Sequence, residues 1–320
     1  YIGDLQSWPS PAADDDGITL LINEIRDHLG ASGRLGMMMG RETAIRMPFN
    51  DLRALESGLD GIAFCDMTNA IQHIRMVKSA AEQAKLTHIC QLVSGVFADV
   101  PQWAKAGMPL DNLFRKFKIK ALTAGVDDVS YLVGSAGPDG YQDIIAPPNS
   151  RPLAAGDLFM LDTGCVWDGY FSDFDRNFAI HHASDEAHET HHRLYDATQA
   201  AIDILRPGVT AADLFFAMDA ILRPDHQCSS QHEQISAVKT GDDGVGRYGH
   251  GLGTQLTEPP SHTNWDQTVI TAGMTLTLEP SLGYGNGLTM VAEENLLVLE
   301  DRVVLLSTRA PRDLPVIPAG

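Results

Sequence analysis

The stretch LDTGCVWDGYFSDFDR, residues 161–176, decides the fold because it sets acidic residues into two apolar segments that are close in sequence. DLFMLDTG is typical of a buried strand, and YFSDFDRNFAI predicts a second strand after the short link CVWDGY. Such a hairpin would bring Asp162 and Asp173 side by side on one face. Two carboxylates on one buried face repel each other unless a cation or a proton neutralises them, so the stretch indicates a metal site.

Three further residues have the character of metal ligands: His250 in GHGLG, Glu279 in LTLEP and Glu293 in VAEENLLV. A single buried acid is usually a core polar group with satisfied hydrogen bonds, but several acids with a glycine-framed histidine are better explained by metal. Oxygen-rich ligands with one imidazole suit Mn, Fe, Co or Zn in a two-metal site. Two metals about 3.5–4 Å apart can activate water and polarise a carbonyl oxygen.

The composition excludes several classes of partner. The chain has 320 residues, 44% of them hydrophobic and 20% charged, which fits a globular protein of one large and one smaller domain. A net charge of −19 argues against binding to nucleic acid or to an anionic membrane surface. We find no apolar run long enough for a membrane span and no visible signal peptide. The cysteines are scattered without short-range pairing, which favours a reduced, cytoplasmic protein: Cys65, Cys90, Cys165 and Cys228.

Apolar spacing and turn residues outline the elements along the chain. We expect a domain boundary after residue 68, with a small α/β segment at 1–68 and a larger domain at 69–320. The polar stretch 223–248 is expected to be a long loop. The chain opens at YIGDLQSWPSP without methionine, and we expect it to be part of a longer protein. Helices are predicted at 17–29, 50–60, 68–96, 110–124, 184–205 and 210–222, and strands at 33–40 and in MTLTLEP and VAEENLLVLEDRVVLLS.

These motifs, with LRPGVT and IRMVKSAAE, resemble the creatinase, aminopeptidase P and methionine aminopeptidase superfamily, the M24 peptidases. The resemblance implies an α+β chain: a pita-bread catalytic domain, in which helices flank a curved antiparallel sheet, after a partial creatinase-type α/β N-terminal domain. It also implies two divalent metal ions (Mn, Co, Fe or Zn), a general base at Glu279, and a homodimer. The superfamily's metal ligands fall on Asp162, Asp173, His250, Glu279 and Glu293.

The resemblance breaks at two positions where peptidases of this superfamily usually carry histidines that donate hydrogen bonds to the substrate. Ile145 or Ala146 stands at one of them and Thr257 at the other. Losing one such donor costs about 10²–10³ in rate. Two residues are candidates to compensate as groups near the substrate: His262, whose alternative reading is a surface loop residue, and Tyr141.

Residues next to the second aspartate also depart from the pattern, because Asp175 and Arg176 replace the usual threonine–arginine pair. We expect Arg176 to fix a neighbouring carboxylate in support of the metal site. Asp175 is either a further acid near the site or a partner of Arg176, and the second is favoured. VGSAGPDG lacks the ending of a phosphate-binding loop. The histidines of the polar helix are interpreted as a solvated face: His181, His182, His188, His191 and His192.

Three functions remain open. The first is a dinuclear metal-dependent hydrolase that cleaves a C–N peptide bond, as an Xaa-Pro aminopeptidase or dipeptidase does. The second keeps the metal site for hydrolysis or a lyase reaction on a non-peptide small molecule, since relatives include an amidine hydrolase and a sulfonium lyase. The third is a non-catalytic interaction protein, against which the retained buried acids argue. The expected ligands are short peptides or small molecules.

Overall fold

The computed structural model describes residues 3–224 and 246–319. The chain divides into two compact units, Tyr1–Ile74 and Arg75–Gly320. Most of the stretch 223–248, predicted to be a loop, and Cys228 lie outside the described residues. Within the described residues, no helix is long and apolar enough to cross a membrane.

The first unit is a small α/β arrangement. Helices α1 (Ile18–Leu29) and α2 (Phe49–Gly58) accompany the parallel strands β1 (Arg34–Met37) and β2 (Ala63–Asp66). Its core includes the buried side chains of Leu55, Leu59 and Ile62. Helix α3 (Thr68–Met76) follows and contains the boundary between the two units.

The strands of the second unit form two curved sheets and a hairpin. The six-stranded sheet has the order β15-β7-β5-β3, with β4 and β6 also paired to β5, and the five-stranded sheet has the order β14-β13-β10-β8-β9. The six-stranded sheet consists of β3 (Asp128–Val133), β4 (Ala136–Pro138), β5 (Asp157–Trp167), β6 (Tyr170–Phe171), β7 (Phe174–Ile180) and β15 (Val316–Ile317). The five-stranded sheet consists of β8 (His250–Gly251), β9 (Glu258–Ser261), β10 (Thr275–Leu278), β13 (Glu294–Val298) and β14 (Val303–Leu305), and the hairpin pairs β11 (Ser281–Tyr284) with β12 (Leu288–Val291).

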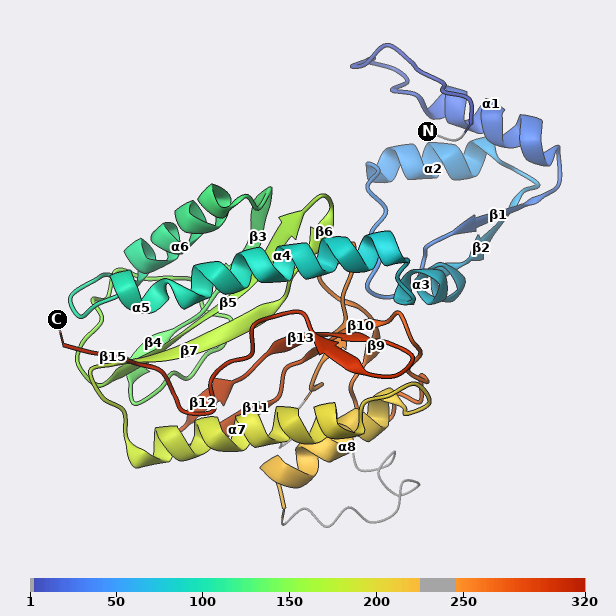
Figure 1. Ribbon diagram of the computed structural model, residues 1–320. Helices are drawn as coiled ribbons and strands as arrows, with labels where there is room; N and C mark the ends of the chain where they lie inside the picture. Colours follow the sequence, from blue (N-terminus) through green and yellow to red (C-terminus); the bar gives the residue numbers. More distant parts are fainter. Residues whose placement is uncertain (1–2, 225–245, 320) are drawn as a thin grey trace. The chain divides into compact units, whose positions relative to one another are not determined.

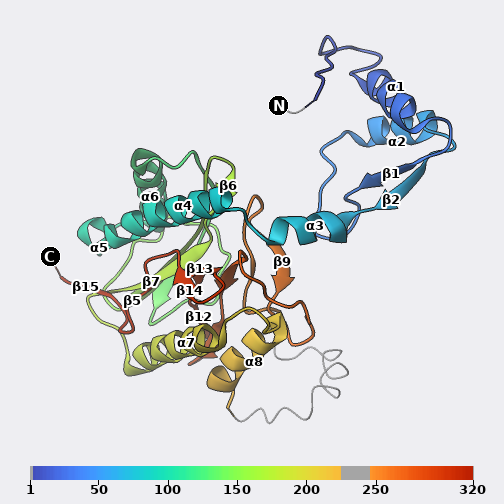
Figure 2. The same cartoon turned by 45° about the vertical axis from the view of Figure 1, so that its right-hand side comes forward.

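Helices cover the strands of this unit on two sides (Figure 1). In both views, α4 and α6 lie on one side of the strands, and α7 and α8 lie on the other (Figure 2). Two hydrophobic clusters correspond to these layers, one joining α4 and α6 to β5 and β7, the other joining α7 and α8 to β10 and β13. The predicted α+β class is therefore confirmed. The helices of this unit are α4 (Ala80–Ala98), α5 (Val100–Trp103), α6 (Leu110–Ala124), α7 (Asp185–Ile204) and α8 (Ala211–Leu222).

The single helix predicted over residues 68–96 is wrong, because the chain breaks between α3 and α4. Ser79 begins α4 with a capping box to Glu82, which satisfies the free N–H groups of a helix start. The backbone N–H of Lys78 donates to the carbonyl of Gly273, and its Nζ lies 2.9 Å from the buried carboxylate of Glu258. These tertiary contacts outweigh the helical propensity of the segment.

Candidate metal centre

The two sheets contribute all five predicted ligands. Asp162 belongs to β5, and Asp173 directly precedes β7 of the same sheet. His250 lies in β8, Glu279 follows β10, and Glu293 precedes β13, all in the five-stranded sheet. Ligand atoms of Asp173, His250 and Glu293 lie within 4.8 Å of one another, and all three residues are buried.

The glycine before His250 is required by its surroundings. Gly249 has a φ of +143°, a conformation that L side chains rarely adopt. A Cβ at this position would stand 2.3 Å from the carbonyl oxygen of Thr277 and 2.3 Å from Cδ2 of His262. The glycine frame seen in the sequence therefore lets β8 pack tightly, and this packing fixes the backbone that carries His250.

The imidazole of His250 is oriented with Nε2 toward the carboxylates. Its Nδ1 lies 2.9 Å from the carbonyl oxygen of Gly251, and because a carbonyl only accepts, Nδ1 carries the proton. Nε2 lies 3.4 Å from Oδ2 of Asp173 and 3.7 Å from Oε2 of Glu279, where its lone pair would bind a cation when the ring is neutral. A backbone carbonyl on the other ring nitrogen is the usual partner of a metal-binding histidine.

Single oxygens of the buried acids lack a hydrogen bond that would compensate their burial. Oδ1 of Asp162 and Oε1 of Glu293 have no hydrogen-bond partner. Burial, and then the charge of Asp173, raise the pKa of both groups well above the ordinary value. Burial raises the pKa of Asp173 to about 6, against the hydrogen bond and charge of His250. Burial alone would lower the pKa of His250, but the charge of Glu279 and the bond to Asp173 raise it overall.

This donor set fits a divalent cation. Several oxygens and one imidazole nitrogen converge without donors to satisfy them, and such acceptors repel each other unless a positive charge lies between them. The mixture of carboxylates and one imidazole is the set that Mn, Fe, Co and Zn accept.

Strand register corrects the predicted pairing of the aspartates. In β5 and β7, Asp162 is directly opposite Asp175, and Asp173 lies two positions before Asp175. Residues two apart share a face of a strand, so the three acids face the same side. Asp175 is 1% exposed, one of its oxygens accepts from Nδ2 of Asn177 at 3.0 Å, and Oδ1 has no partner. Burial raises its pKa well above the ordinary value.

The interpretation of Asp175 as the ion-pair partner of Arg176 is therefore wrong, although the charge of Arg176 lowers the pKa of this carboxyl against the effect of burial. Arg176 donates to the backbone oxygen of Asp175 at 2.5 Å, whereas its ion pair is with Glu294 at 3.0 Å. The carboxylate of Asp175 is left facing Asp162, which makes it a further acid of the cluster. Local sequence favoured the ion pair because the two residues are adjacent, but adjacent side chains of a strand point to opposite faces.

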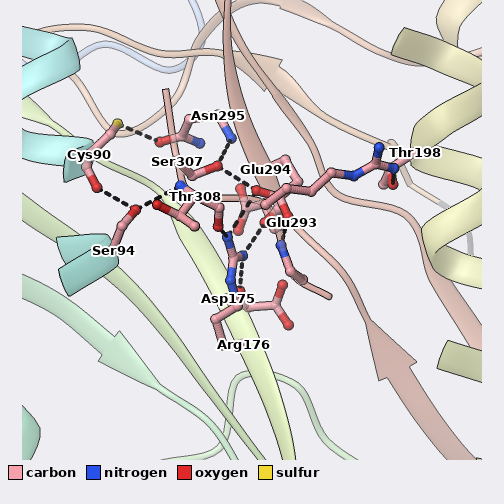
Figure 3. A network of polar contacts seen from close by, with 12 residues as sticks. Cys90, Ser94, Asp175, Arg176, Thr198, Glu293, Glu294, Asn295, Ser307 and Thr308 are labelled. Carbon is pink, nitrogen blue, oxygen red and sulfur yellow. Dashed lines mark hydrogen bonds and ion pairs between the residues drawn. The ribbon is translucent and has the colours of Figure 1, made fainter. Parts of the chain in front are cut away.

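Polar side chains tie β7 to the segment that carries Glu293 (Figure 3). Arg176 Nη1 donates to the backbone oxygen of Glu293 at 2.9 Å. Asn295 accepts from the backbone N–H of Asp173 at 3.0 Å and donates to the backbone oxygen of the same residue. The two strands that supply Asp173 and Glu293 are thus held in one arrangement by buried hydrogen bonds.

The positions of the missing histidines differ in their surroundings. Ile145 is 65% exposed, whereas Thr257 is partly buried and its Oγ1 lies 3.3 Å from Nη2 of Arg247. Arg247 Nε in turn lies 3.2 Å from Oε1 of Glu279. Sequence reasoning missed Arg247, and its place three residues before His250 was the available signal.

Both residues suggested as replacements for the lost histidines are buried. His262 is 0% exposed, and burial lowers its pKa to about 3, so the ring is neutral. This burial contradicts the interpretation of His262 as a surface loop residue, whereas its catalytic role stays a prediction because both ring nitrogens have no hydrogen-bond partner. The hydroxyl of Tyr141 donates to Asn177 at 2.8 Å and accepts from the N–H of Val291 at 3.2 Å, so it is a structural link.

The solvated face predicted for the histidines of α7 is wrong at His191. Its side chain is buried, and its Nδ1 lies 3.0 Å from the carbonyl oxygen of Arg312. Burial lowers the pKa of His191 to about 4. The C-terminal segment covers this part of the helix, and the helix's own sequence does not reveal that cover.

Residues 84–305 match the sequence pattern of metallopeptidase family M24. The chain belongs to this family. It is 26% identical over 254 residues to a probable dipeptidase PepE of Mycobacterium bovis. The matched region covers 79% of this chain and 64% of the relative. The crystal structure of dipeptidase PepE from Mycobacterium ulcerans has a TM-score of 0.77 at 27% identity and covers 95% of this chain and 76% of that one.

A recombinant prolidase from Thermococcus sibiricus has a TM-score of 0.82 at 20% identity, over 99% of this chain and 80% of that one. At this identity the likeness shows the fold alone. The predicted M24 membership and the pita-bread fold are confirmed by these similarities.

Proposed function

We propose that this M24 protein is a metal-dependent hydrolase of a C–N bond, an Xaa-Pro dipeptidase or aminopeptidase in kind. The proposal rests on the convergence of unpartnered carboxylate oxygens and Nε2 of His250 between the two sheets. Relatives named as dipeptidases support it, and the chain spans 64% of the length of the Mycobacterium bovis PepE and 65% of that of the Lactobacillus Xaa-Pro dipeptidase. Two divalent cations would be held by Asp162, Asp173, His250, Glu279 and Glu293.

Bound cations would supply Lewis acidity toward a carbonyl oxygen and toward water. The protein's own groups supply orientation and proton transfer. Glu279 is the best placed for proton transfer, because its side chain is 22% exposed whereas that of His250 is 2% exposed. Arg247 holds Oε1 of Glu279 at 3.2 Å, which orients the carboxylate. Asp175, opposite Asp162, would add a further carboxylate to the cation site.

A second candidate keeps the same metal site for hydrolysis or a lyase reaction on a non-peptide small molecule. The observation that favours it is the pair of substitutions at Thr257 and Ile145, which remove two hydrogen-bond donors that peptidases of the family use on substrate. The hydroxyl of Tyr141 is engaged within the fold by Asn177 and Val291, and the ring of His262 is fully buried.

Metal analysis and a peptide assay separate these candidates. The purified protein is analysed for bound metal, stripped, and reloaded with Mn or Co, and then assayed on Xaa-Pro dipeptides. Cleavage that depends on metal supports the first proposal. Bound metal without cleavage of any peptide supports the second, and absence of metal binding would favour a non-catalytic interaction protein. Manganese or cobalt as the resident ion, a homodimer and a cytoplasmic location are proposed on the family resemblance alone.

A further inference from the structure

We propose that Glu258 positions the imidazole of His250 for the cation, and that two cationic side chains hold Glu258 in place. The two cations are Lys78 and Arg75, and we call these three residues the Glu258 network. This inference rests on the proposed metal-dependent function and deepens it, because it names residues outside the ligand set on which the metal centre depends. The network acts on His250 through the backbone of β8.

The ring of His250 takes its orientation from the carbonyl of Gly251, which lies 2.9 Å from Nδ1. Gly251 belongs to β8, a strand of two residues, and the register of β8 with β9 shifts between His250 and Gly251. A shifted register interrupts the ladder of backbone hydrogen bonds at this point. The carbonyl that orients the ring therefore needs support from outside the ladder.

Glu258 is the residue paired with Gly251 on the far side of this shift. The two strands approach closely there, since a Cβ on Gly251 would stand 2.9 Å from the carbonyl oxygen of Glu258 and 2.1 Å from that of Pro259. Close-packed atoms transmit a displacement, so a movement of β9 at this point passes to Gly251. The position of Glu258 thus determines where the carbonyl of Gly251 points.

Two cations hold the carboxylate of Glu258. Its side chain is 3% exposed, with Oε2 2.9 Å from Nζ of Lys78 and Oε1 2.7 Å from Nη2 of Arg75. Lys78 is itself fixed, because its backbone N–H donates to the carbonyl of Gly273 and its Nζ donates to that of Met76. A buried ion pair adds little stability compared with apolar packing, but its directed bonds fix a position.

The same carboxylate organises the loop 252–257, which joins β8 to β9. Its Oε1 accepts from the backbone N–H of Gln255 at 3.2 Å, and Arg75 also donates to the hydroxyl of Thr254. A Cβ on Gly253 would stand 2.6 Å from Oε2, so the loop wraps the carboxylate closely. The loop and the strand pair are therefore fastened at one point.

The loop also contacts the segment that leads to an aspartate ligand. The carbonyl of Gly253 accepts from the backbone N–H of Phe171 at 2.9 Å, two residues before Asp173. Loss of the network would therefore disturb His250 and Asp173 together, and these two side chains approach to 3.4 Å. Affinity for a cation is the quantity that reports this disturbance.

Cobalt titration of the metal-stripped protein, followed by visible absorption, tests the proposal without turnover. We expect Arg75→Met, which alters a side chain that is 27% exposed, to weaken cobalt affinity about 10-fold and to change the absorption band of the bound ion. Arg75→Lys keeps the charge and should restore part of the affinity. The double variant Lys78→Met with Glu258→Leu leaves neither buried partner charged, and it should weaken the affinity about 100-fold.

Arg151→Met is the matched control. Arg151 is 40% exposed and lies 2.8 Å from the carboxylate of Asp157, which is 1% exposed, so this ion pair resembles that of Arg75. Asp157 begins β5, at the end of the strand away from the loop contacts. This variant should lower Tm and leave the cobalt affinity and the absorption band unchanged.

An unchanged affinity and band in Arg75→Met, with a lowered Tm, would overturn the proposal, because the network would then support the fold and not His250. Arg75→Met decides this even when the double variant does not fold. An equal loss of affinity in Arg151→Met would also overturn it, since any loss of stability would then weaken the site.

The result is separable from that of the proposed function. If the unaltered protein binds cobalt but cleaves no peptide, the hydrolase assignment fails, and the titrations still decide the role of the network. If the unaltered protein cleaves peptides and the variants keep its cobalt affinity, only the positioning role fails. An unaltered protein that binds no cobalt would overturn both proposals.

Discussion

Replacing Asp175 with asparagine should stabilise the metal-free protein and reduce the further stabilisation that bound metal adds. Asp175 is opposite Asp162 in the strand register, and its Oδ1 is buried without a partner. Cross-strand neighbours stand about 5 Å apart, so two charges repel by about 3 kcal/mol at an effective dielectric constant of about 20. Asparagine keeps the shape, still accepts from Asn177, and removes this repulsion.

The expected magnitude follows from that repulsion as an upper limit. Without metal, Asp175→Asn should raise the free energy of unfolding by about 1–3 kcal/mol, and each kcal/mol raises Tm by about 2–4 °C in a domain of this size. With excess metal, loss of a carboxylate that contacts or supports the cation should lower affinity about 10- to 100-fold. That loss removes about 1.4–2.7 kcal/mol of the stabilisation that the ion supplies.

Thermal unfolding followed by circular dichroism, in chelator and in Mn, measures both the metal-free gain and the loss of metal-dependent stabilisation on one variant. Asp301→Asn, an exposed aspartate paired with Arg302, is the control and should leave both transitions unchanged. An equal rise in Tm on adding Mn to the variant and to the unaltered protein would refute the reasoning, because Asp175 would then act on the fold and not on the cation. No shift of Tm in either state would mean that the carboxylates of Asp175 and Asp162 do not repel each other.

Three other predictions follow from the same cluster. In chelator, the free energy of unfolding should fall as pH rises from about 4 through 6, because the raised pKa of Asp173, about 6, makes the folded state bind protons more tightly than the unfolded state. Denaturant titrations at several pH values measure this dependence, and added metal should remove it. Asp173→Ala should abolish metal binding and activity, and an unchanged metal content by elemental analysis would contradict the ligand assignment. Asn295→Ala should lower the free energy of unfolding, measured in urea, by at least about 2 kcal/mol and should weaken metal binding, because it leaves the buried backbone N–H and carbonyl of Asp173 without their partners. An unchanged metal affinity would show that these two hydrogen bonds do not hold Asp173 in place for the cation.

The ligand set was predictable from sequence because its signals are local. A strand of apolar residues that ends in an acid, and a histidine whose neighbours are glycines, each have a physical reason within a few residues of the chain. Gly249 shows this, since the packing that forbids a side chain there is also what fixes His250. The grouping of these residues in space then came from the resemblance to the family and not from any single stretch.

Features that depend on distant partners could not be read in the same way. The break before α4 depends on Lys78, whose Nζ is held by Glu258, 180 residues later in the chain. His191 is buried because the carbonyl of Arg312 and its segment cover α7. The neighbours of Asp175 were misjudged because strand register, and not adjacency in sequence, decides which residues face one another.

The charges of Asp175 and Arg247 enter the charge balance of the metal-loaded site, and this balance leads to a prediction about the substrate. Four carboxylates with a neutral imidazole balance two divalent cations, and Asp175 adds a negative charge that Arg247 offsets near Glu279. The carboxylate of a dipeptide then leaves the site with an excess negative charge, so a zwitterion should bind better than a plain anion. Acetylating the amino group of an Xaa-Pro dipeptide should therefore raise KM by about 10-fold or more, and equal KM values for the free and acetylated dipeptides would show that the five acids are not all ionised in the loaded site.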